Sequence, residues 1–139
     1  MRLWAISDLH VRYPQNRQAV QQMGFYSNDW LIVAGNVGET VDHLDWTLGE
    51  LRRRFAKVFW VPGNHDLWST SDDASRRGVE RYMKLVDICH RQNCITPEDD
   101  CVFVARNNGH VTGYTYFRAL RLQLSAERYS LRASRQMGR

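Results

Sequence analysis

The sequence lacks long apolar runs and a paired set of cysteines. None of its apolar runs approaches the ~20 residues that a membrane-spanning helix needs, and Asp8 interrupts the N-terminal run before it could form a signal peptide. We therefore expect a cytoplasmic protein with no membrane partner. The three cysteines match neither a C-x-x-C pattern nor a zinc knuckle, so we expect reduced thiols rather than a disulfide or a metal site at Cys89, Cys94 and Cys101.

Acidic residues are almost absent from the C-terminal end of the chain. Residues 102–139 contain seven arginines and one acidic residue, Glu127, for a net charge of +6, whereas residues 1–101 carry a net charge of −2. The charge of +4 on the whole chain therefore comes from the last 38 residues. An interaction with nucleic acid would depend on this segment alone, and we do not expect one.

The length and composition indicate one globular domain. The 139 residues include 43% hydrophobic residues and 16 aromatic residues, enough to bury a core. Four apolar runs read as strands, and helix-like segments lie between them. Alternating strands and helices predict a parallel sheet with right-handed crossovers, an α/β fold of the order βαβαβαβ.

The expected elements follow from periodicity and turn residues. Strands are expected at Leu3–Ser7, Trp30–Ala34, Lys57–Val61 and Cys101–Ala105. A first helix is expected over Gln15–Gly24, and a second is capped by Thr40 or Asp42 and buries Val41, Leu44, Leu48, Leu51 and Phe55. A third begins at Ser71 and buries Val79, Tyr82, Met83, Val86 and Cys89. The run Arg52–Arg54 is expected to be the solvated end of the second helix.

Regular patterns end near Ala105. We expect a domain over residues 1–105 and an irregular, Arg-rich tail over residues 106–139 that is poorly ordered or weakly helical. Val111–Phe117 could form one more strand, but the apolar residues after Arg118 follow no sustained period.

Polar clusters follow each of the first three expected strands. Asp8-Leu9-His10, Gly35-Asn36-Val37-Gly38-Glu39 and Gly63-Asn64-His65-Asp66 place residues 8, 36 and 64 at intervals of 28 positions. Because the carboxyl ends of parallel strands meet at one edge of a sheet, these side chains should converge. Carboxylate, amide and imidazole groups gathered in this way suit divalent metal ions and phosphoester chemistry.

The residue types suggest individual roles. Asp8 and His10 would bind one ion from the same face if the strand continues through them, and Asn64 would add an amide oxygen. His65 would act on the leaving-group oxygen as a general acid or stabilise the transition state. Gly35 and Gly63 allow sharp turns, and Asp66 would hold the loop or orient His65. Any one of these motifs alone would be ordinary turn chemistry.

Asn36 weakens the expectation of catalysis. Two divalent ions about 3.5–4 Å apart need a bridging anion, and the end of the second strand is where a carboxylate would supply it. An asparagine has a similar shape but no charge. We therefore expect at most one tightly bound ion.

At these residues the chain resembles the calcineurin-like metallophosphoesterase superfamily. The family signature is Asp-x-His, then Gly-Asp with a nearby Glu, then Gly-Asn-His-Asp or Gly-Asn-His-Glu. This chain matches it except at the second motif, where it has Gly35-Asn36 in place of Gly-Asp. The resemblance implies the N-terminal half of a four-layer α/β/β/α sandwich and two divalent ions (Mn, Fe, Zn or Mg). It further implies metal ligands at Asp8, His10 and Asn64, a catalytic His65, and Asn36 in the bridging position. Glu39 matches the nearby Glu of the signature.

The resemblance stops near Ala105. The family closes its site with later histidines, and Gly109-His110 only partly resembles that motif, so His110 is a weaker ligand candidate. The Arg-rich end suggests a truncated or frame-altered coding sequence. We consider two functions: a metal-dependent hydrolase of phosphomonoesters or phosphodiesters, impaired here, or a non-catalytic half-domain that acts by binding. The substrate class stays open, and an unfinished sheet could self-associate.

Overall fold

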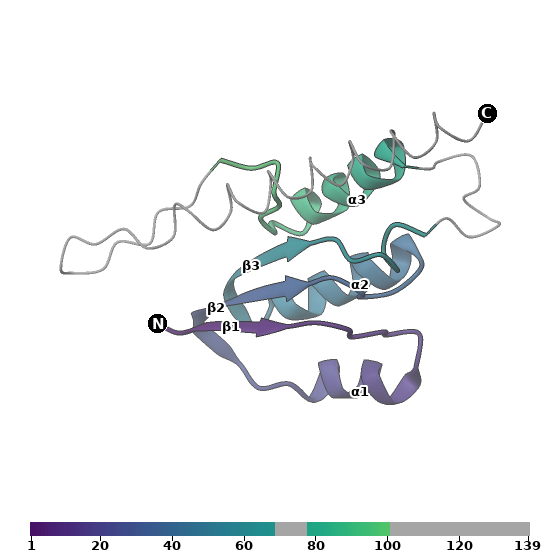
Figure 1. The fold of residues 1–139 in the computed structure, drawn as a ribbon. Helices are drawn as coiled ribbons and strands as arrows, with labels where there is room; N and C mark the ends of the chain where they lie inside the picture. Colours follow the sequence, from purple (N-terminus) through teal and green to yellow (C-terminus); the bar gives the residue numbers. More distant parts are fainter. Residues whose placement is uncertain (69–77, 101–139) are drawn as a thin grey trace, which may run out of the picture. The chain divides into compact units, whose positions relative to one another are not determined.

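The computed structural model describes residues 1–68 and 78–100, and one compact unit runs from Met1 to Thr96. Its elements are β1 (Leu3–Ile6), α1 (Pro14–Gln22), β2 (Tyr26–Ala34), α2 (Val41–Arg52), β3 (Phe55–Val61) and α3 (Val79–Arg91) (Figure 1). Four of the predicted features lie outside the described residues. They are the helix start at Ser71, the strand at Cys101–Ala105, the possible strand at Val111–Phe117 and the Arg-rich tail. The helices of the described ranges are too short or too polar to cross a bilayer.

The sheet confirms the predicted α/β class. Its three strands are parallel and lie in the order β1-β2-β3, with Ile6 opposite Val33 and Ala34 opposite Val61. Each strand is followed by a helix, and α1 and α2 return the chain to the start of β2 and β3 (Figure 1). The three predicted strands are therefore adjacent, and their carboxyl ends lie along one edge.

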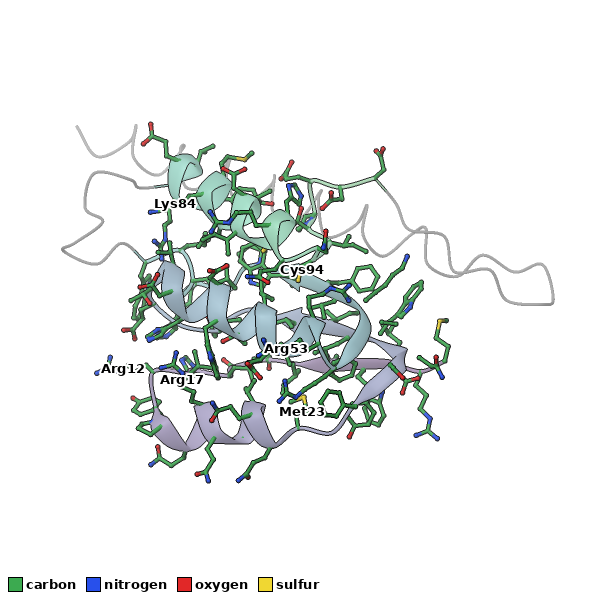
Figure 2. The ribbon with its side chains drawn as sticks, turned by 180° about the vertical axis from the view of Figure 1, so that it is seen from behind. Arg12, Arg17, Met23, Arg53, Lys84 and Cys94 are labelled. Carbon is green, nitrogen blue, oxygen red and sulfur yellow. The ribbon has the colours of Figure 1, made fainter. Side chains whose placement is uncertain are left out.

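One face of the sheet carries the core. Alternate residues of β2 and β3 are almost fully buried, and one apolar cluster joins them to side chains from all three helices. From the sheet it contains Leu31, Val33, Val58 and Trp60, and from the helices Val20, Leu44, Leu48, Leu51, Leu85 and Ile88. The helices therefore cover the same face (Figure 2). On the opposite face, Leu3 is 61% exposed and Trp30 is half-buried, whereas Phe59 in the middle of β3 is 2% exposed.

The helix after β2 begins as its sequence suggests. Of the two expected caps, Thr40 is the N-cap, and its Oγ1 accepts a hydrogen bond of 3.1 Å from the backbone N–H of His43. Leu44, Leu48 and Leu51 are buried as expected. Phe55, expected on the same stripe, instead begins β3, because the helix ends at Arg52.

The prediction of a solvated Arg52–Arg54 run was wrong for Arg54, whose exposure is 7%. Its guanidinium donates to the backbone carbonyls of Gln21, Met23 and Glu50, at 2.7, 3.0 and 2.7 Å. It also pairs with the Glu50 carboxylate at 2.7 Å. The carbonyls at the end of α1 have no helical partner, and a buried arginine provides the donors they need.

The apolar stripe predicted for α3 is also shifted. Tyr82, Val86 and Cys89 are buried as expected, but Val79 is 53% exposed and Met83 is 43% exposed. A second row of side chains on this helix is buried instead. It comprises Arg81, Leu85 and Ile88, at i, i+4 and i+7. This rotation places an arginine below the loops that follow β2 and β3.

Candidate functional site

The loops after β1 and β2 continue side by side beyond the sheet. The backbone N–H groups of Asp8 and His10 donate to the carbonyls of Gly35 and Asn36, at 3.2 and 3.0 Å. Asp8, His10 and Asn36 have positive φ angles of 55°, 41° and 54°. Backbone in this region is unfavourable for residues other than glycine and is often found at functional sites.

The premise that β1 continues through Asp8 and His10 was wrong, because the strand ends at Ile6. The two side chains nevertheless approach each other, with His10 Nε2 3.7 Å from Asp8 Oδ1. Left-handed backbone at both residues, rather than strand alternation, brings them together. Asn16 of α1 supports this loop by donating to the carbonyl of Leu9 at 2.8 Å.

Two glycines let the loops after β2 and β3 pack against each other. Gly35 has a φ of +75°, and a Cβ there would overlap the backbone of Gly63. A Cβ on Gly63 would overlap the side chain of Asn36. Both positions therefore need glycine for close approach, as well as for turning.

Asn36 lies at the centre of the cluster and joins all three loops. Its Nδ2 donates to Asp8 Oδ1 at 2.8 Å, and its Oδ1 accepts from the backbone N–H of His65 at 3.1 Å. The hydrogen bond from Asn36 is the main cause that lowers the pKa of Asp8 below its usual value. A carboxylate at position 36 could not donate a hydrogen bond to Asp8. The two carboxylates would repel each other unless a cation lay between them.

His65 is partly buried among aromatic and acidic groups. Its ring lies 3.8 Å from the Trp68 ring and meets the His10 ring edge-on, with centroids 4.9 Å apart. Glu39 Oε1 lies 3.9 Å from Nδ1, close enough for attraction but too far for a hydrogen bond. Nδ1 is buried and has no hydrogen-bond partner within the described ranges.

Asp66 holds the loops rather than facing the site. It is 1% exposed. Its Oδ2 accepts from the backbone N–H groups of Asn36 and Gly63, at 2.9 and 2.8 Å, and its Oδ1 accepts from Val37 and Gly38, at 2.9 and 3.3 Å. Burial raises the pKa of Asp66, and the four N–H donors oppose that rise. One carboxylate therefore joins the loop after β2 to the loop after β3.

Two arginines near the site were not identified in the sequence. Arg12 Nη1 contacts both oxygens of Glu39, at 3.3 and 3.2 Å. Arg81 is 2% exposed and donates to the backbone carbonyls of Asp66 and Glu39, at 3.2 and 3.0 Å. The burial of Arg81 could have been inferred from its spacing, because it lies four residues before Leu85 and seven before Ile88, on the same face of α3.

Asp8 and His10 are spaced as two ligands of one divalent ion would be. Two donors that bind the same ion at about 2.1 Å each can lie up to about 4 Å apart, which suits the 3.7 Å between Asp8 Oδ1 and His10 Nε2. In the part of the chain that the structure describes, no group of three or more His, Cys, Asp or Glu side chains could hold a metal. Further ligands would be amides such as Asn36, or the exposed Asn64. His110 lies outside the described residues.

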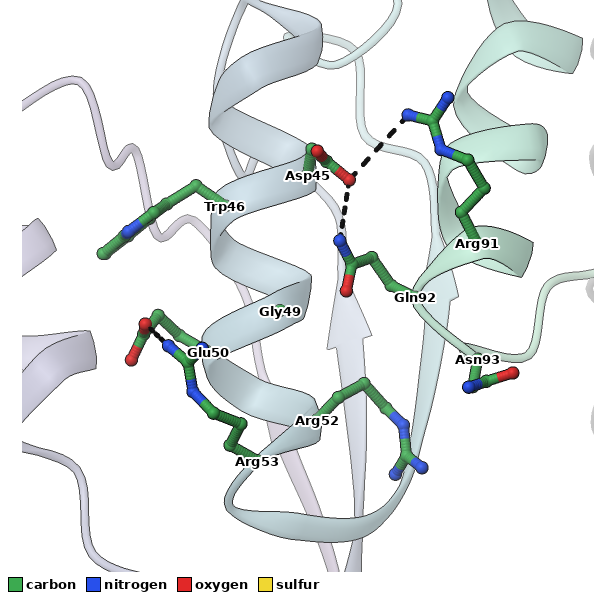
Figure 3. Close-up of a pocket in the computed structure, with 9 residues that line it drawn as sticks. All are labelled: Asp45, Trp46, Gly49, Glu50, Arg52, Arg53, Arg91, Gln92 and Asn93. Carbon is green, nitrogen blue, oxygen red and sulfur yellow. Dashed lines mark hydrogen bonds and ion pairs between the residues drawn. The ribbon is translucent and has the colours of Figure 1, made fainter.

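A separate pocket lies away from this edge. It has a volume of about 440 Å³ and is lined by α2 and the end of α3 (Figure 3). Asp45 accepts a hydrogen bond from Gln92 at 2.8 Å and faces Arg91 at 3.9 Å, while Glu50 pairs with Arg53. The charged groups in this pocket are thus largely paired with one another, and none of the expected site residues lines it.

Comparisons with known proteins identify a matching family, a similar sequence and a similar fold. A family model described as calcineurin-like phosphoesterase matches residues 1–124. The acyl-carrier-protein phosphodiesterase PptH of Mycobacterium tuberculosis is 50% identical over 98 residues, which are 69% of this chain and 30% of that protein. The solved structure of phosphopantetheinyl hydrolase PptH from M. tuberculosis has a TM-score of 0.70 and 45% identity, covering 75% of this chain and 38% of that chain.

The chain thus spans less than two fifths of the length of these relatives. Its parallel sheet with flanking helices corresponds to the N-terminal half of the fold, as predicted. The family model covers most of the chain. The chain belongs to the calcineurin-like phosphoesterase family.

Proposed function

We propose that this chain provides the N-terminal half of a metal-dependent phosphodiesterase site, and that Asn36 impairs the site in this copy. The observation that carries the proposal is the convergence of Asp8, His10 and His65 around Asn36 at the ends of three parallel strands. Calcineurin-like phosphoesterases use divalent metal ions. Asp8 and His10 are the residues that would hold one.

A divalent ion at this position would supply positive charge to a phosphoryl oxygen. His65 lies beside the same position, and its imidazole would donate a proton to the leaving-group oxygen. Glu39 attracts Nδ1 and so orients the ring, and Arg12 in turn holds Glu39. Asp66 fixes the backbone on both sides of His65 and Asn36 through its four N–H contacts.

For the substrate, we propose the phosphodiester that joins phosphopantetheine to an acyl carrier protein. Support comes from the relative named acyl-carrier-protein phosphodiesterase, at 50% identity over 98 residues. A non-catalytic binding role is the second candidate. It is favoured by one observation, the neutral Asn36 in the bridging position, where it satisfies Asp8 with a hydrogen bond instead of a cation.

Mass spectrometry of an acyl carrier protein tests this proposal. The 139-residue chain, with Mn²⁺ added, should remove phosphopantetheine at a rate near background, because only one ion is held tightly. The Asn36→Asp chain should release it measurably, and faster than it cleaves an aryl phosphomonoester. Brisk release by the wild-type chain would contradict the proposed impairment. No release by either chain, while generic phosphoesters are cleaved, would contradict the proposed substrate.

A further inference from the structure

Arg81 lies beneath two loops of the candidate site, although it belongs to a helix that contributes no expected site residue. It stands in the first turn of α3 and is 2% exposed. Arginine is rarely buried to this degree unless its donors are matched by acceptors. The acceptors therefore indicate what the side chain holds in place.

Two of these acceptors come from different loops. Nε donates to the carbonyl of Asp66 at 3.2 Å, and Nη2 donates to the carbonyl of Glu39 at 3.0 Å. Asp66 directly follows His65, and Glu39 is the residue whose carboxylate approaches His65 Nδ1. The planar guanidinium therefore fixes the backbone on both sides of the contact between His65 and Glu39.

The same two loops are already joined from another direction. The Asp66 carboxylate accepts N–H groups from the loop after β2 and from Gly63. That contact sets the loops against each other, but it leaves Glu39, one residue beyond Gly38, outside its reach. Arg81 provides the bond to Glu39 and connects the pair of loops to α3.

We propose that Arg81 is a positioning residue, which sets the distance between His65 and Glu39 by binding the backbone of both loops. This rests on the proposed function, in which His65 acts on the leaving group. A general acid that is displaced by a fraction of an ångström loses rate without losing substrate affinity. The effect of Arg81 should therefore fall on kcat rather than on KM.

Hydrogen exchange on the full chain tests the structural part without any activity. The variants are Arg81→Lys, which keeps the charge but cannot span two carbonyls, and Arg81→Met. Arg91→Lys is the matched control, since Arg91 lies on the same helix and its side chain is 66% exposed. In both Arg81 variants, amides of residues 36–39 and 63–67 should exchange at least about tenfold faster, while the cores of β2 and β3 stay within about twofold.

The kinetic part uses the Asn36→Asp background and an aryl phosphodiester. Adding Arg81→Lys should lower kcat by about tenfold and leave KM within about twofold, whereas Arg91→Lys should change neither. Three results would overturn the proposal. They are amide exchange that is equally faster throughout the sheet, unchanged exchange in the two loops, and failure of both Arg81 variants to fold. If the Asn36→Asp chain hydrolyses nothing, the proposed function fails, while hydrogen exchange still decides the role of Arg81.

Discussion

Replacing Asn36 with aspartate should increase phosphodiester hydrolysis by about 100-fold or more and allow a second divalent ion to bind. The side chain lies between Asp8 and His65, 2.8 Å from the Asp8 carboxylate and 3.1 Å from the His65 backbone nitrogen. An aspartate there keeps the acceptor for the His65 N–H and exchanges a neutral donor for a negative charge. Two neighbouring carboxylates bind divalent ions more tightly than one carboxylate and an amide.

The same substitution should lower the melting temperature of the metal-free chain. Without an ion, the new carboxylate faces Asp8 at hydrogen-bond distance, and like charges repel. Added Mn²⁺ should more than reverse this loss. Asn28→Asp is the matched control, because it makes the same chemical change in an exposed residue at the other end of β2. Unchanged hydrolysis and a single bound ion in the Asn36→Asp chain would contradict the assignment of the bridging position.

Replacing Asp66 with asparagine should lower the free energy of unfolding at neutral pH by about 2–4 kcal/mol. One carboxylate oxygen becomes an NH₂ group, which faces two of the four backbone N–H donors and leaves them without an acceptor. Urea unfolding measures the change. Asp87→Asn, an exposed position on α3, should change the free energy of unfolding by less than about 0.5 kcal/mol. A similarly small effect at Asp66 would contradict its role as the link between the loops.

The stability difference between the wild-type chain and Asp66→Asn should depend on pH. The pKa of Asp66 is raised by burial above its ordinary value of 3.8. A carboxyl with a raised pKa contributes stability that is fully present below 3.8 and is lost as the pH rises through the folded-state value. The asparagine variant has no such titration. The advantage of the wild-type chain over Asp66→Asn should therefore be larger near pH 4 than near pH 7.

The parallel pairing of the strands and the meeting of the polar clusters could be predicted from the sequence. Trp30–Ala34 and Lys57–Val61 are apolar runs that end in glycine-containing turns. In the sheet the two runs pair residue by residue, from Trp30 with Lys57 to Ala34 with Val61. The evenly spaced clusters then had to meet, because parallel strands end at one edge. The start of β2 at Tyr26 was missed, since Ser27-Asn28-Asp29 is polar and the pairing is irregular between Tyr26 and Trp30.

Buried arginines could not be predicted in the same way. Arg54 and Arg81 are buried by carbonyls at helix ends and in loops, and those carbonyls become acceptors only once the chain has folded. Sequence periodicity records apolar faces and gives no information on such acceptors. The contact between Asp8 and His10 was also predicted for the wrong reason, because it depends on left-handed backbone that non-glycine residues seldom adopt. The metal and catalytic roles of these residues stay predictions.

The most direct test of the site is a calorimetric titration of Mn²⁺ into the wild-type chain and into Asp8→Asn. Asp8 and His10 are the pair expected to hold an ion, and Asn36 withholds the charge that a second ion would need. The wild-type chain should bind about one ion, and Asp8→Asn should lose that binding by about 100-fold or more in affinity. Two tightly bound ions in the wild-type chain, or binding that is indifferent to Asp8, would contradict the assignment of this sheet edge as a metal site disabled at its bridging position.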